Sequence, residues 1–157
     1  MGEMMKDNTV INLVSDIIPG KSIGGISLGD NVVDIIECIG DEFTIDVFSF
    51  ENFGVKYFCY KINNGAISFT CNESGNIISL WCEPPYLGSF NKRLYPGITV
   101  GELKKISKKQ SIIKGYLVID NNKLIYYGMP DDIDDFNHFS DLDDDVIFNE
   151  LYVGNLE

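Results

Sequence analysis

Apolar residues recur at helical spacing in three stretches of the chain. The first covers residues 9–18 and ends at Pro19-Gly20, a pair that stops helices. Its apolar positions follow the i, i+3, i+4, i+7, i+8 pattern of one helix face: Val10, Leu13, Val14, Ile17 and Ile18. Two further helices are predicted over residues 28–39 and 100–109. The predicted buried side of the former consists of Val32, Val33, Ile35, Ile36 and Ile39.

A short motif occurs twice, once before each of the two later helices. It reads Gly-Ile-Ser-Leu-Gly-Asp over residues 25–30 and Gly-Ile-Thr-Val-Gly-Glu over residues 97–102. In both copies a hydroxyl residue stands three positions before an acid, which is the pattern of a helix capping box. We expect Ser27 and Thr99 to accept a hydrogen bond from the first turn, while the acid folds back to the amide of the cap. The duplication predicts two related halves.

Runs rich in aromatic and β-branched residues, bounded by turn signals, predict strands in both halves. In the first half the expected strands are 43–50, 55–62, 66–71 and 77–82. In the second half they are 112–119, 123–127 and 146–153. Asparagine-containing turns at 63–65 and 120–122 indicate antiparallel hairpins. The predicted fold class is therefore α+β, with helices packed on antiparallel meander sheet(s) in two tandem half-repeats of a helix followed by strands.

Length and composition predict one domain with a real core. The chain has 157 residues, of which 45% are hydrophobic, and this composition excludes a disordered acidic protein. We expect a single domain over residues 1–157, with half-repeats at about 21–83 and 94–154 after the helix at 9–18. The joint between the halves is expected at Pro84-Pro85-Tyr86-Leu87-Gly88.

The formal net charge of −12 is the strongest compositional signal. It argues against nucleic acid as a partner, because phosphates require a basic surface, and it disfavours anionic membranes for the same reason. A basic protein is the natural complement, since opposite fields accelerate encounter. The same charge also fits simple solubility, so it does not identify a function alone.

Most of the excess charge lies in one tract, residues 131–145. It holds eight aspartates and no cation, and removing them would change the net charge from −12 to −4. The aspartates are Asp131, Asp132, Asp134, Asp135, Asp141, Asp143, Asp144 and Asp145. Apolar residues recur every three positions within it: Ile133, Phe136, Phe139 and Leu142. This stripe predicts a short helix or 3₁₀ turn held to the body, with the carboxylates outward.

The strand expected at 55–62 carries apolar or aromatic residues on both faces. One face must cover a helix, and the other packs elsewhere or presents aromatic side chains to a partner. Tyrosine and tryptophan are favoured anchors in protein interfaces. We therefore select Tyr57, Tyr60 and Trp81 as candidate anchors, although core packing explains most aromatic strand residues.

Catalytic and metal-binding motifs are weak in this sequence. The single histidine, His138, lies among aspartates, and no nucleophile elbow, H-E-x-x-H motif or P-loop is present. Asp132-x-Asp134 begins like a calcium loop, but Phe136 stands at the third ligand position. We expect no catalytic residue, no metal site and no cofactor. Acid–base chemistry by paired carboxylates stays open as a minor alternative.

The cysteines and the N-terminus bear on the compartment. Cys38, Cys59, Cys71 and Cys82 form no C-x-x-C pair, which is poor spacing for zinc and suggests buried thiols. Asp16 interrupts the apolar run at 10–18, so we expect no secretory signal. Together these features predict a cytoplasmic protein with reduced cysteines.

A small, strongly acidic α+β chain of this kind resembles the immunity proteins of bacterial toxin systems, and most of all those of contact-dependent growth inhibition. The duplicated Gly-Ile-Ser/Thr-Leu/Val-Gly-Asp/Glu element also resembles the helix-plus-sheet repeat of β-lactamase inhibitor proteins and of small outer-membrane assembly lipoproteins. The immunity resemblance implies binding and neutralisation of one cognate toxin domain, often a nuclease. It implies no particular contact residues.

The predicted function is thus an immunity protein that neutralises a basic nuclease domain in the cytoplasm. The alternatives are an adaptor for another cytosolic protein and, less favoured, a carboxylate-dependent hydrolase. We expect the aspartate tract to occupy the basic field that attracts substrate phosphates, with aromatic anchors slowing dissociation. The candidate partner-binding residues are Asp131, Asp132, Asp134, Asp135, Asp141, Asp143, Asp144, Asp145, Tyr57, Tyr60 and Trp81.

Overall fold

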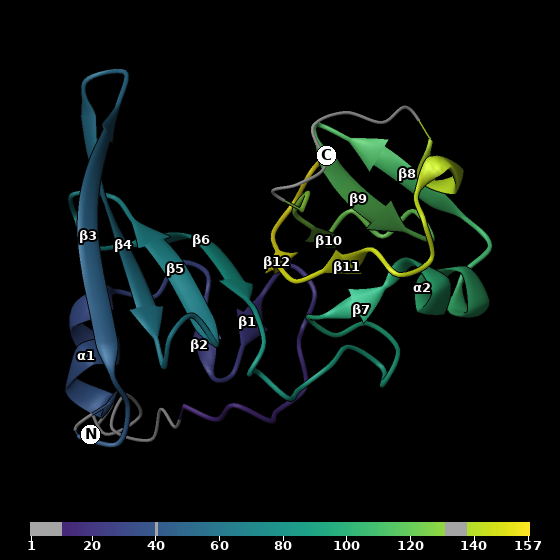
Figure 1. The fold of residues 1–157 in the computed structure, drawn as a ribbon. Helices are drawn as coiled ribbons and strands as arrows, with labels where there is room; N and C mark the ends of the chain where they lie inside the picture. The colour runs from purple at the N-terminus through teal and green to yellow at the C-terminus, as the bar shows by residue number, and fades with distance from the viewer. Residues whose placement is uncertain (1–10, 40, 131–137) are drawn as a thin grey trace.

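One eight-stranded antiparallel sheet dominates the computed structural model, which describes residues 11–39, 41–130 and 138–157 (Figure 1). From one edge to the other the strands are β3 (Ile45–Asn52), β4 (Val55–Ile62), β5 (Ile67–Cys71), β6 (Ile77–Cys82), β12 (Leu151–Val153), β10 (Ile125–Tyr127), β9 (Tyr116–Ile119) and β8 (Gln110–Ile113). The last strand of the second half, β12, lies between β6 and β10 and joins the two halves into one sheet.

The α+β prediction is wrong, because the described chain is predominantly β. Its α-helices are two short ones, α1 (Val32–Ile39) and α2 (Val100–Ile106). Helix α1 begins later than predicted, and helix α2 ends earlier than predicted. Gly29 has a φ of +88°, which delays α1, and Ser107 is already extended, which ends α2. Aromatic and β-branched runs form the longer strands of the sheet.

The predicted N-terminal helix is wrong over its described residues, 11–18. This segment runs beside residues 87–89 instead: the amide of Leu87 donates to the carbonyl of Leu13, and that of Ile17 to the carbonyl of Ser89. Ile17 is buried, whereas Val14 is 59% exposed. The helical spacing failed because these backbone bonds to a distant segment replace the i→i−4 ladder.

Each copy of the duplicated motif forms a two-residue strand before its helix. β2 (Ile26–Ser27) pairs with β1 (Ser22–Ile23), and β7 (Ile98–Thr99) pairs with β11 (Ile147–Phe148). Ile26 and Ile98, the isoleucines of the two copies, are both buried. The duplication in sequence therefore corresponds to a repeated strand-to-helix unit.

Each copy of the motif shows one half of the predicted capping box. The Thr99 hydroxyl accepts from the Glu102 amide at 3.2 Å, as expected of an N-cap. In the first copy the Asp30 carboxylate accepts from the Ser27 amide at 2.9 Å. The helix itself begins later, where the side-chain oxygen of Asn31 accepts from the amide of Val33 at 3.0 Å.

The strand predictions are accurate in the first half and too long in the second. The predicted strand at 112–119 is two strands, β8 and β9, because Lys114 and Gly115 adopt positive φ and form a tight turn. The predicted strand at 146–153 is likewise split into β11 and β12, which pair with different partners.

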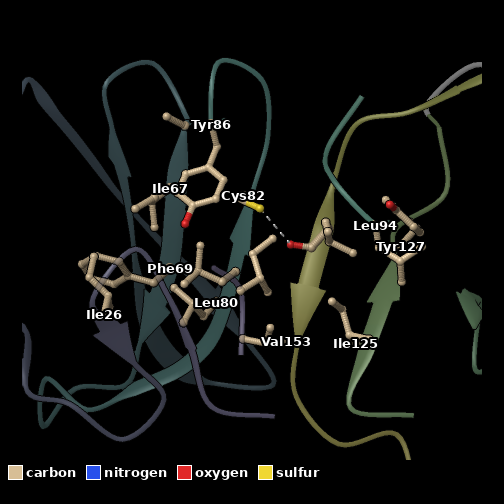
Figure 2. Packing of buried hydrophobic residues seen from close by; sticks show 14 of the residues in the cluster. Ile26, Ile67, Phe69, Leu80, Cys82, Tyr86, Leu94, Ile125, Tyr127 and Val153 are labelled. Atoms are coloured by element: carbon tan, nitrogen blue, oxygen red, sulfur yellow. Dashed lines mark hydrogen bonds between the residues drawn. The ribbon is translucent and has the colours of Figure 1, made fainter. Parts of the chain in front are cut away.

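Both helices pack on the same face of the sheet and form one buried cluster with it. Figure 2 shows side chains of both halves meeting where β6 lies beside β12, with the Cys82 thiol donating to the Leu151 carbonyl at 3.7 Å. In α1, Val32, Ile35 and Ile39 are buried as predicted. Val33 and Ile36 are exposed, so the apolar stripe of this helix is narrower than its sequence indicated. None of the helices in the described ranges is both long and apolar enough to cross a membrane.

Candidate functional site

The face of the sheet opposite the helices carries the candidate site, and we call it the open face. Its side chains follow from the strand registers: Tyr57 on β4, Ser68 on β5, Trp81 on β6, Tyr152 on β12, Tyr126 on β10 and Tyr116 on β9. The buried cluster that holds the helices contains none of these residues. Alternation along each strand therefore separates a helix-covered face from an open one.

Four of these aromatic side chains form a continuous row across the middle of the open face. The Tyr152 ring stacks on Trp81 at a centroid distance of 5.2 Å and on Tyr126 at 5.8 Å. Tyr116 meets Tyr126 edge-on at 4.8 Å and Tyr152 at 5.4 Å. All four are half-buried, so each ring keeps an accessible part. We call this set the aromatic row.

An acidic hollow adjoins the aromatic row at the ends of β6, β12 and β10. Its volume is about 530 Å³, and three carboxylates line it, from Glu83, Asp145 and Glu150. The indole N–H of Trp81 donates to Glu83 at 3.3 Å. The hydroxyl of Tyr152 donates to Glu150 at 3.1 Å. These two bonds connect the row to the hollow, so aromatic surface and negative charge form one continuous site.

Tyr126 and Tyr152 stay neutral at physiological pH, because the structure raises the pKa of both. Burial raises the pKa of Tyr152, and the nearby Glu150 carboxylate raises it further. Burial, with a smaller effect of Tyr116, also raises the pKa of Tyr126. Tyr126 and Tyr152 therefore offer flat aromatic faces and hydroxyl donors rather than phenolates.

The structure describes only part of the predicted aspartate tract, residues 138–145. Asp131, Asp132, Asp134 and Asp135 lie outside the described residues. The remaining aspartates, Asp141, Asp143, Asp144 and Asp145, are all exposed, in agreement with the predicted outward carboxylates. Phe139 and Leu142 are buried, and a 3₁₀ turn, η2 (Phe139–Asp141), forms as the apolar stripe predicted.

Part of this tract has a structural role. The carbonyl of Asp144 accepts from the Gly101 amide at 2.9 Å, and its carboxylate accepts from Lys104 at 2.9 Å. This segment therefore covers the first turn of α2, where the helix dipole favours a carboxylate. The ammonium group of Lys104 neutralises the charge of Asp144. Within the described part of the tract, Asp145 alone lines the acidic hollow.

The predicted aromatic anchors do not lie together. Trp81 belongs to the aromatic row, as described above. Tyr57 lies on the open face but on β4, where it stacks with Phe50 at 5.5 Å. Tyr60 lies on the helix-covered face and stacks on Phe69, a core residue, at 5.2 Å. Tyr60 therefore shares no surface with Trp81.

Sequence reasoning missed most of the site. Tyr116, Tyr126 and Tyr152 of the row, and Glu83 and Glu150 of the hollow, were not selected. The Leu-Tyr-Val and Ile-Tyr-Tyr strands each contain a tyrosine between buried neighbours, which signals one open-face aromatic per strand. The insertion of β12 between β6 and β10 is what brings them together, and no local pattern indicates it.

Metal-ligating and nucleophilic side chains of the described residues can be placed individually. They contain no group of three or more His, Cys, Asp or Glu side chains that could hold a metal ion. His138 is exposed at the start of η2, beside Gln110 and Ser111 of β8. Burial raises the pKa of Cys59 and, to about 11, that of Cys71, so these thiols are poor nucleophiles at neutral pH.

The geometry suits recognition of a cation. Carboxylates at the rim of an aromatic surface can pair with a guanidinium or ammonium group while its carbon chain lies on the rings. No protein-family model, curated protein or solved structure matches this chain.

Proposed function

We propose that this chain is a non-catalytic binding protein for a basic protein domain, and that it acts as an immunity protein that neutralises a cognate toxin, a nuclease, in the cytoplasm. The resemblance to toxin immunity proteins supplies the biological role. The open face supplies the physical means of binding.

A single observation carries the proposal: the aromatic row lies against the acidic hollow. Trp81 and Tyr152 each donate to a carboxylate of the hollow, Glu83 and Glu150 respectively. Both rings are thereby held in fixed orientation before a partner arrives, which reduces the entropy lost on binding. Tryptophan and tyrosine at the centre of a surface are the residue types that dominate binding energy.

Charge explains how such a surface would find its partner. With a net charge of −12, the whole molecule attracts a basic domain, and exposed Asp141 and Asp143 add to the field near the second half. A nuclease active site is basic because it binds phosphates. An acidic surface docked on or beside it competes with nucleic acid for the same charges.

The test is protection from the product of the reading frame immediately upstream in the genome. That product is expressed in cells with and without this chain, and growth and co-purification are measured. We expect wild-type protein to restore growth and to co-purify, and Trp81→Ala to lose most of both. Tyr95→Ala is the matched control, because Tyr95 is 38% exposed and lies outside the strands of the sheet. It should behave as wild type.

Failure of wild-type protein to bind or protect would overturn the immunity proposal. Binding without protection would also overturn it, and would favour an adaptor. Equal protection by wild type and Trp81→Ala would show that the aromatic row does not bind the partner.

A further inference from the structure

The two edge strands of the eight-stranded sheet, β8 and β3, differ in what contacts them. At one edge, β8 is contacted by the 3₁₀ turn η2, whose Phe139 is buried. At the other edge, β3 pairs with β4 on one side, and no described residue pairs with it on the other. A strand of 8 residues thus presents unpaired backbone groups, and such an edge is a template for another strand.

The β3–β4 hairpin is also the most apolar exposed part of the described chain. Val47 is 52% exposed, Phe48 is 50% exposed and Phe50 is 41% exposed, all on the edge strand. Phe53 in the connecting turn is 97% exposed. Figure 1 shows this hairpin projecting beyond the strands beside it. Val47 lies on one face of the sheet and Phe48 and Phe50 lie on the other, so the edge strand exposes apolar side chains on both faces, which indicates an interaction surface.

The hairpin carries no net charge, unlike the chain as a whole. Asp46 lies opposite Lys61, and Glu51 lies opposite Lys56, so its two acids face its two bases. A neutral surface gives no attraction to a basic partner. It does let two copies of a strongly acidic chain approach each other with the least repulsion.

The sequence of β3 is complementary to itself in one antiparallel register. If Ser49 faces Ser49 of a second copy, then Phe48 faces the second copy's Phe50, and Val47 faces its Glu51. Ile45 at the strand start faces Phe53 at the turn of the other copy. Aromatic residues pair twice in this register and no like charges stand opposite, which are the conditions that favour a strand pair.

We propose that two copies of this chain associate through antiparallel pairing of β3 with β3 about a two-fold axis at Ser49. The pairing extends the sheet across both copies and brings Phe48 of each copy against Phe50 of the other. The aromatic row lies on β6, β12, β10 and β9, away from this edge, so the dimer leaves the proposed partner surface free. The inference is independent of the proposed function.

The test is the mass of the purified full chain by sedimentation across micromolar to millimolar concentrations. We expect wild-type protein to shift from monomer to dimer. Ser49→Lys places two cations opposite each other and Ser49→Asp places two anions, so each variant alone should weaken the dimer by about fivefold or more. An equimolar mixture of the two variants should restore it, because Lys then faces Asp. Circular dichroism checks that both variants are folded.

Ile78→Lys is the matched control, because Ile78 is 50% exposed on β6 and outside the proposed interface. It should dimerise as wild type does. A wild-type chain that is monomeric throughout would overturn the inference. A dimer indifferent to both Ser49 variants, or one that the mixture does not restore, would overturn it as well.

Discussion

Tyr152 contacts every other ring of the aromatic row on the open face. Its ring contacts Trp81, Tyr126 and Tyr116, and its hydroxyl reaches Glu150. It lies on the central strand of the junction between the halves, between the buried residues Leu151 and Val153. The alternation of side chains along the strand predicts that Tyr152 points away from the core. Which side chains lie beside it depends on the order of the strands in the sheet.

Removing the Tyr152 ring should destabilise the protein more than removing its hydroxyl. We expect Tyr152→Ala to cost about 2 kcal/mol of unfolding free energy, because three ring contacts are lost from a half-buried site. Tyr152→Phe keeps the rings and loses one hydrogen bond, so it should cost about 1 kcal/mol or less. Urea denaturation measures both. Equal losses in the two variants would contradict the role given to ring stacking.

The buried cysteines make stability sensitive to alkali. Burial raises the pKa of Cys71 from 9.0 to about 11, so the thiol stays protonated in the folded chain while it ionises in the unfolded one. Its contribution to stability is complete below pH 9.0 and is lost as pH rises through about 11. We expect the unfolding free energy to fall across this range, and to fall less steeply in Cys71→Ala. An equal slope in the two proteins would contradict this assignment.

At the scale of elements, sequence reasoning succeeded where local chemistry decides and failed where distant pairing decides. The four strands of the first half were placed to within two residues, because turn residues bound them. The N-terminal helix was wrong because residues 11–18 bond to the distant segment 87–89. The break between β8 and β9 was missed because Lys114 is an unusual residue for a left-handed turn position.

That turn offers a direct test of the split strand. Gly115 has a φ of +85°, and a Cβ there would meet no atom within 4 Å. Gly115→Ala should therefore cost about 1 kcal/mol through backbone strain alone. Lys114→Asn should raise stability by a few tenths of a kcal/mol, since asparagine tolerates positive φ. Thermal unfolding measures both. No loss in Gly115→Ala would argue against a turn at this position.

At the scale of the whole molecule, the site exists because β12 inserts between β6 and β10. The insertion places Tyr152 beside Trp81, and Glu150 with Glu83 in one hollow. Each residue is visible in the sequence, but only this topology makes them a surface. The sequence predicted an aspartate tract with outward carboxylates, and part of that tract proves to cover α2 and the edge of β8.

The most direct test of the central claim is a titration of this chain against the purified upstream product at low and moderate salt. We expect tight binding that weakens as salt rises. Replacing Glu83, Asp145 and Glu150 by their amides should reduce this salt dependence, and Trp81→Ala should weaken binding at every salt concentration by about tenfold or more. Binding that is indifferent to all four residues would contradict the account.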